Sequence, residues 1–136
     1  MPTDTAPHAI ALLRISLGAV FLAHGLVLKF MTFGLAGTMG FFGSLGYPPM
    51  LGAVVALAEI LAGLALVLGV LVRPAALLML PILLGATLTH AGNGWVFNAT
   101  GGGWEFPAFL TVATLAQAGL GAGALAWQPA ALRRPA

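Results

Sequence analysis

Apolar residues form four long runs along the chain, and short segments rich in glycine, proline or polar residues separate them. An α-helix rises about 1.5 Å per residue and the bilayer core is about 30 Å thick, so about 20 apolar residues can cross it. The pattern therefore predicts an all-α membrane protein, folded as a four-transmembrane-helix bundle. We expect a single domain over residues 1–136, with spans at about 8–29, 50–72, 74–91 and 105–127.

The segment between the first two runs has a different pattern. Residues 30–49 carry glycine at nearly every third position, with phenylalanine and tyrosine among them. Such a segment is too broken to span and too apolar for a free aqueous loop, and aromatic residues favour the headgroup level. We expect a loop with a short interfacial helix here. A second loop, GNGWVFNATGGGW at residues 92–104, separates the last two runs.

Composition supports a membrane protein. Of the 136 residues, 60% are hydrophobic and only 6% are charged, whereas a soluble domain has about 25% charged residues. The net charge is +2 and the basic residues are scattered, so nucleic acid is not an expected partner. The chain has no cysteine, which excludes thiolate metal ligands and thiol redox chemistry within it. The expected environment is the lipid bilayer.

Basic residues are distributed unevenly between the two sides of the predicted bundle. Four spans place both termini on one side, together with Arg73, Arg133 and Arg134. The opposite side has Lys29 alone. The positive-inside rule therefore predicts a multi-pass protein with both termini in the cytoplasm and both loops outside. Because the first eight residues contain no lysine or arginine, we expect the first run to be retained as a span.

The run at residues 50–72 contains one charged residue, Glu59. Gly52, Ala56, Glu59 and Gly63 fall at i, i+4, i+7 and i+11, which is one face of an α-helix. A stripe of small residues lets another helix approach closely, so Glu59 is expected to point into protein. An acid at membrane depth is a functional-site hypothesis by default.

The other polar residues concentrate in the outer half of the predicted bundle. His24 and His90 lie near the outer ends of their helices, and Glu59 lies somewhat deeper. We expect a pocket between the helices, roofed by the two loops and lined by His24, Lys29, Glu59, His90 and Glu105. The candidate proton-relay or hydrogen-bonding residues are Glu59, His24 and His90. The candidate ligand-binding residues are Arg14, Lys29, Asn93, Trp104 and Glu105.

Each of these residues also has a structural interpretation. Glu59 can be neutralised by a nearby cation and simply hold the bundle together. Lys29 and Arg14 can extend to the membrane interfaces, and Trp104 can serve as an interfacial anchor. The two histidines can be hydrogen-bonded within the core, or they can ligate haem or a metal ion. No HxxxH or HExxH spacing supports a metal site, so we predict none.

Several stretches together resemble the DoxX family of small four-helix bacterial membrane proteins. They are LLRISLGAVFLAHGLVLKF, GTMGFFGSLGYPP, ALAEILAGLALVLG and THAGNGWVFNATGGGWEFPAFL. The resemblance implies a bacterial inner-membrane location and a wider family that includes the membrane subunit of thiosulfate:quinone oxidoreductase. Other relatives are linked to redox-stress complexes, and many have no assigned activity. The family's motif positions correspond here to Arg14, His24, Lys29, Glu59, His90 and Glu105.

Three functional hypotheses follow. The first is a membrane subunit or accessory protein of a redox system that offers a quinone or small-molecule pocket and works with a soluble or membrane redox partner. The second is a non-enzymatic scaffold, assembly factor or small-molecule or lipid carrier. The third is a haem or metal protein that uses His24 and His90. Quinone is the first cofactor candidate and haem the second. The small-residue helix faces also favour a homo-oligomer.

Overall fold

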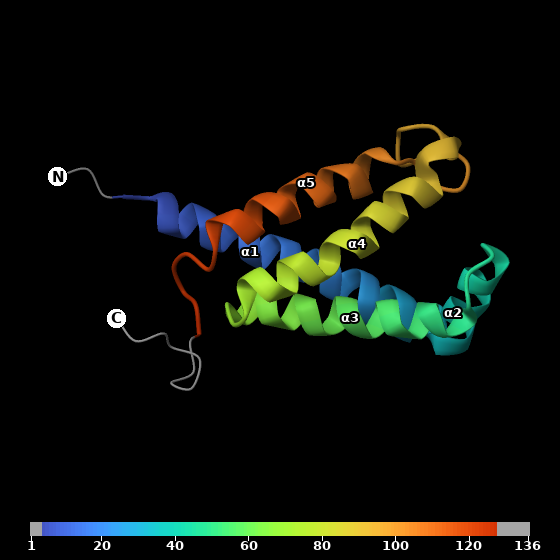
Figure 1. Cartoon of the computed structure of the whole chain (residues 1–136), viewed down its shortest axis with the longest axis horizontal. Helices are drawn as coiled ribbons and strands as arrows, with labels where there is room; N and C mark the ends of the chain where they lie inside the picture. Colours follow the sequence, from blue (N-terminus) through green and yellow to red (C-terminus); the bar gives the residue numbers. More distant parts are fainter. Residues whose placement is uncertain (1–3, 128–136) are drawn as a thin grey trace.

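A computed structural model describes residues 4–127 of the chain. Within that range the protein is all-helical and contains no strand. In chain order (Figure 1) the elements are α1 (Ala6–Leu22), the π-helix η1 (Ala23–Thr32), α2 (Gly34–Ser44), α3 (Pro49–Leu68), α4 (Val72–His90), the short 3₁₀ helix η2 (Ala91–Asn93) and α5 (Glu105–Leu120).

Three helical segments of the described chain are long and apolar enough to cross a membrane, namely Ala6–Thr32, Pro49–Leu68 and Val72–Asn93. The prediction of four spanning helices is not confirmed. The expected fourth span, 105–127, is helical only from Glu105 to Leu120, and its 16 residues extend about 24 Å. The helix stops because Gly121 turns to φ 80°, ψ −152°, a conformation that breaks the α-helical register.

The helices pack as two pairs, α1 with α3 and α4 with α5, which also contact each other. Figure 1 shows α2 and the 94–104 loop at one end, called here the α2 end. The start of α1 and the end of α5 lie at the opposite end, called here the Arg14 end. A short connection at residues 69–71 joins α3, which ends at Leu68, to α4, which begins at Val72, whereas the expected boundary between these spans was at residues 72–74. Arg133 and Arg134, which support the predicted orientation, lie outside the described residues.

The small-residue stripe on α3 forms the contact with α1 and η1. All four members of the predicted stripe, from Gly52 to Gly63, are buried. A Cβ atom on Gly18 of α1 would lie 2.8 Å from the Gly63 carbonyl oxygen, and one on Gly25 of η1 would lie 2.9 Å from the Ala56 oxygen. The backbones are therefore close enough to exclude larger side chains, as the sequence predicted.

The segment between the first two runs contains a helix, α2, as predicted. It packs on the start of α3, where a Cβ atom on Gly52 would lie 3.0 Å from the Phe42 ring. The side chain of Thr38 is buried, whereas Phe41 on the same helix is exposed. The helix α2 is therefore fixed to the α1–α3 pair and leaves an aromatic side exposed.

Candidate functional site

A cavity of about 600 Å³ lies at the α2 end, between the α1–α3 pair with α2 and the α4–α5 pair. The cavity wall is largely apolar and is rich in phenylalanine side chains from α1, the η1–α2 junction, α2, α5 and the 94–104 loop. The polar side chains that line it are His24, Lys29, Thr38, Glu59 and His90. Four of the five residues predicted to line a shared pocket therefore do so. This combination of an apolar wall and a few convergent polar groups is typical of small-molecule sites.

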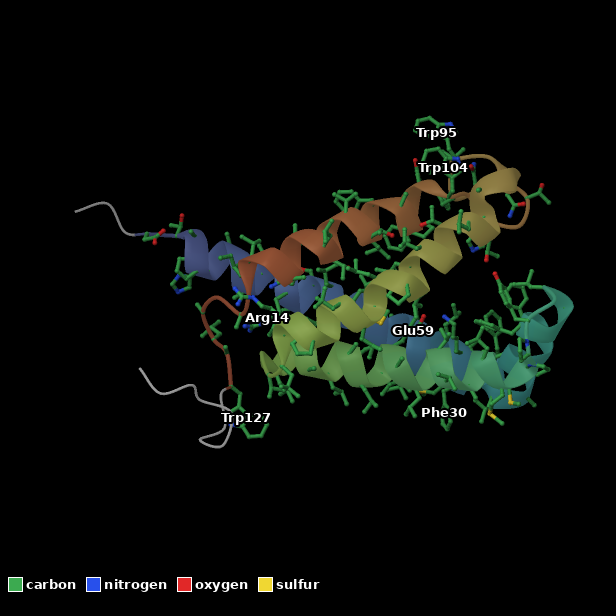
Figure 2. The ribbon with its side chains drawn as sticks, viewed as in Figure 1. Arg14, Phe30, Glu59, Trp95, Trp104 and Trp127 are labelled. Atoms are coloured by element: carbon green, nitrogen blue, oxygen red, sulfur yellow. The ribbon has the colours of Figure 1, made fainter. Side chains whose placement is uncertain are left out.

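An ion pair occupies one side of the cavity. The Lys29 Nζ atom lies 3.1 Å from Oε1 and 3.0 Å from Oε2 of Glu59. The Glu59 side chain is 8% exposed and the Lys29 side chain 17%. In Figure 2 the Glu59 carboxylate lies between α3 and α4. Because the pair removes the net charge from both groups, it is compatible with membrane depth while its oxygens and ammonium stay beside the cavity.

The π-helix η1 places two cavity residues on one face. In an α-helix of 3.6 residues per turn, positions five apart point about 140° away from each other. A π-helix bonds each N–H to the carbonyl five residues earlier, so such positions lie nearly one above the other. The cavity is lined by His24, Leu28 and Lys29 of this segment and by Phe33 directly after it, a spacing that follows the π register. The register therefore brings His24 and Lys29 to one cavity.

The His24 ring is held by two contacts. Its Nδ1 atom lies 2.9 Å from the Val20 carbonyl oxygen. Because a carbonyl oxygen only accepts, Nδ1 carries the hydrogen, and in the neutral ring Nε2 is left as an acceptor. The ring also stacks on Phe106 of α5, with centroids 6.2 Å apart and planes at 30°. His24 therefore joins the two helix pairs across the cavity.

His90 faces the cavity from the end of α4. Its Nδ1 atom is buried and has no hydrogen-bond partner within residues 4–127. Gly102 lies against this ring, since a Cβ atom there would be 3.4 Å from Nδ1. Gly102 also has φ +86°, which an L side chain rarely adopts. The glycine-rich loop thus closes over His90 and leaves a buried nitrogen with unused hydrogen-bonding capacity.

The structure does not bring Arg14 to the cavity. Its guanidinium is fully buried at the opposite end, where it donates to the carbonyl oxygens of Ala122, Ala124 and Leu125. Figure 2 shows Arg14 and Glu59 at well-separated positions along the bundle.

Asn93 and Trp104 of the second loop and Glu105, the first residue of α5, also lie off the cavity wall. Asn93 donates from Nδ2 to the Gly101 oxygen at 3.3 Å. The backbone N–H groups of Trp104 and Glu105 donate to carbonyls of the same loop, at 3.2 and 3.0 Å. Asn93, Trp104 and Glu105 therefore shape the loop that covers the cavity.

Sequence reasoning missed the apolar residues that frame the cavity and one buried polar residue. Phe33, Phe41 and Phe97 line the cavity although their side chains are 60%, 55% and 77% exposed, so they form its mouth. The available signal is their place in the two aromatic-rich segments between the runs, which by itself indicates only a preference for the membrane interface. Thr38 lines the cavity and is 3% exposed. Nothing in its local sequence marks it.

The described residues contain no group of three or more histidine, aspartate or glutamate side chains placed to hold a metal ion. His24 and His90 share the cavity wall, but His24 uses Nδ1 on a backbone carbonyl.

Comparison with known proteins supplies a family. The sequence model of the DoxX family matches residues 9–92, more than half of the chain and including all the polar cavity residues. A relative named "Putative oxidoreductase CatD", from Bacillus subtilis (strain 168), is 38% identical over 78 residues. The match covers 57% of this chain and 56% of that protein, so the chain spans about half the length of the relative. No solved structure gives a significant match.

Proposed function

Given that this chain belongs to the DoxX family, we propose that it is a membrane component of a redox system that binds a quinone in the cavity at its α2 end. The name of the matched relative supports an oxidoreductase context. The chain itself has no cysteine, so electrons come from a soluble or membrane partner. We further propose a bacterial inner membrane, cytoplasmic termini and a cavity in the outer half of the bilayer.

The observation that carries this proposal is the polarity gradient of the cavity. Its mouth is formed by Phe33, Phe41 and Phe97, whereas the ion pair and the two histidines lie on its walls. An apolar mouth at bilayer depth favours a ligand already dissolved in the membrane over a water-soluble ion. A quinone has this character, with a hydrocarbon tail and two carbonyl oxygens that accept hydrogen bonds.

The polar side chains have distinct proposed roles. Reduction of a quinone to a quinol takes two electrons from the partner and two protons. Glu59 is the proton-exchanging acid, and Lys29 balances its charge or donates to a quinone oxygen. His90 has a buried nitrogen available for a second hydrogen bond. His24 stacks on Phe106 and so shapes the part of the cavity that receives the quinone ring.

Quinone titration of purified protein in detergent tests the proposal. Trp95 and Trp104 lie in the loop beside the cavity (Figure 2), so quinone binding should quench their fluorescence saturably. We expect Glu59→Gln to weaken binding at least tenfold. Glu105→Gln is the matched control, because Glu105 lies off the cavity wall, and it should leave binding unchanged. Absence of saturable binding to the unaltered protein would refute the quinone proposal.

A second function, a non-enzymatic scaffold or carrier, is favoured by one observation. Lys29 already contacts both oxygens of Glu59, which is the arrangement expected of a purely structural pair. In that case Glu59→Gln should lower stability or partner binding while the unaltered protein binds no quinone. The fluorescence titration and an unfolding measurement on the same two variants separate the two functions.

A further inference from the structure

The π register of η1 needs an explanation outside the segment itself. Its ten residues, Ala23–Thr32, form an unusually long π-helix, whereas π geometry appears mostly as single-turn bulges. At its end the Phe33 N–H donates to the Leu28 carbonyl, five residues earlier, at 2.9 Å. A register this rare persists only where surrounding contacts favour it. Lys29 is the residue that this register turns toward Glu59.

A side chain from another helix contacts the backbone of Lys29. The Thr38 hydroxyl of α2 donates to the Lys29 carbonyl oxygen at 2.8 Å. The carbonyl groups in the last turn of a helix lack partners within that helix, so an external donor is needed there. Thr38 is 3% exposed, so water does not readily replace it. The bond fixes the backbone of Lys29 relative to α2.

The position of Thr38 is in turn fixed by α3, the helix that carries Glu59. A Cβ atom on Gly52 of α3 would lie 3.1 Å from the Thr38 carbonyl oxygen and 3.0 Å from the Phe42 ring. Gly52 and Glu59 are seven residues apart on one helix face. Thr38 therefore connects the Lys29 backbone to the face of α3 that also carries Glu59, the partner of the Lys29 ammonium.

We propose that Thr38 is a positioning residue: its hydroxyl holds the Lys29 carbonyl and so keeps the Lys29 ammonium on Glu59 beside the cavity. Without this bond, η1 relaxes toward α-helical register and Lys29 rotates away from Glu59. The consequence for ligand binding depends on the proposed function, but the positioning role does not. The variant that removes the hydroxyl at nearly constant volume is Thr38→Val, and Thr38→Ser retains it.

The composition of the chain permits a direct test. Lys29 is the only lysine, and Glu59 and Glu105 are the only glutamates. Protein labelled with ¹⁵Nζ-lysine and ¹³Cδ-glutamate, reconstituted in liposomes, reports the Lys29–Glu59 contact by solid-state NMR dephasing without any ligand. We expect strong dephasing in the unaltered protein and in Thr38→Ser, and loss of at least half of it in Thr38→Val.

The control is Thr87→Val in α4. The Thr87 hydroxyl donates at 2.8 Å to Leu83 in its own helix, so its loss should leave the dephasing intact. Unchanged dephasing in Thr38→Val, or equal loss in Thr87→Val, would overturn the positioning role. If Thr38→Val does not fold, Thr38→Ala and Thr38→Ser are compared: equal dephasing overturns the role, and loss in Thr38→Ala alone supports it. Quinone titration of the same samples is a separate result, since the dephasing can change as expected even where no quinone binds.

Discussion

The two ends of the bundle each contain a cation, fully buried at Arg14 and partly buried at Lys29, and each cation has a different kind of partner. Arg14 and Lys29 lie on one continuous helical segment, Ala6–Thr32. Arg14 is fully buried and donates to three backbone carbonyls. Lys29 pairs with Glu59 on the wall of the cavity. Arginine stays protonated, so it requires permanent acceptors, whereas a lysine–glutamate pair can exchange a proton. The comparison indicates that the Arg14 end stabilises the fold, whereas the α2 end is the candidate site of binding or proton exchange.

The Arg14 end is closed by the non-helical segment at residues 121–127. Gly121 ends α5, and the carbonyls beyond it receive the Arg14 guanidinium. The segment also donates to the bundle, since the Ala124 N–H bonds to Pro7 at 2.9 Å and the Trp127 N–H bonds to Leu68 at 2.9 Å. Backbone groups that leave a helix at membrane depth need such partners.

The largest expected effect is that of Arg14→Ala on stability. Removing the buried guanidinium leaves three part-buried carbonyls without donors and opens a cavity, and we expect a loss of about 3 to 5 kcal/mol of unfolding free energy. Arg14→Lys should recover only part of it, because an ammonium cannot reproduce the planar fork. Denaturant unfolding in detergent measures both. A loss below about 0.5 kcal/mol in Arg14→Ala would contradict the structural role of this end.

The next largest effect is expected at the ion pair. Glu59→Gln leaves the partly buried Lys29 ammonium without its counter-ion, at a cost of about 2 to 4 kcal/mol. The double variant Lys29→Met/Glu59→Leu should recover most of that loss, since it removes both charges. Unfolding of the two single variants and the double variant gives the coupling energy. Additive losses would mean that the two side chains are not paired.

Glycine substitutions on α1 and on η1 sharpen the comparison between the Arg14 end and the α2 end. A Cβ atom on Gly18 would collide with Gly63, and one on Gly25 would lie 2.8 Å from the Cβ atom of Glu59. We expect Gly18→Ala and Gly25→Ala each to cost about 1 to 3 kcal/mol through overpacking. Only Gly25→Ala should also weaken quinone binding, because it moves η1 at the cavity. Equal binding defects in both variants would contradict a functional division between the ends.

The smallest expected effect is at the loop over His90. Gly102→Ala places a side chain at φ +86° and adds strain of about 1 kcal/mol. Its Cβ atom also lies against His90, so quinone affinity should fall a few-fold. Gly101→Ala is the control, since Gly101 has a similar φ of +81° but lies beside Asn93. A fall in affinity with Gly101→Ala as large as that with Gly102→Ala would remove His90 from the proposed site.

Much of the α2 end could be predicted from the sequence, because its determinants are local or periodic. Apolar runs predict helices, and the spacing of small residues on α3 predicts both a close helix contact and an inward Glu59. Depth counting then brought His24, Lys29, Glu59 and His90 to one cavity, as found.

The remaining features depend on contacts between distant parts of the chain. The π register of η1 involves Thr38 and Glu59, and no local pattern indicates it. The carbonyls freed where α5 ends at Gly121 receive hydrogen bonds that Arg14, more than 100 residues away, donates. Residues 121–127 are apolar and small, a composition that is equally compatible with a helix continuing to residue 127. The sequence could not distinguish that longer helix from one that ends at Leu120.

Photo-crosslinking with an azido-quinone tests the central claim most directly. We predict saturable adducts on η1, α3 and the 94–104 loop, including the mouth residues Phe33 and Phe97, and competition by unlabelled quinone. Adducts should be lost in Glu59→Gln and retained in Glu105→Gln. Adducts confined to exposed positions outside the cavity such as Leu84, or adducts that excess quinone does not displace, would contradict a quinone site in this cavity.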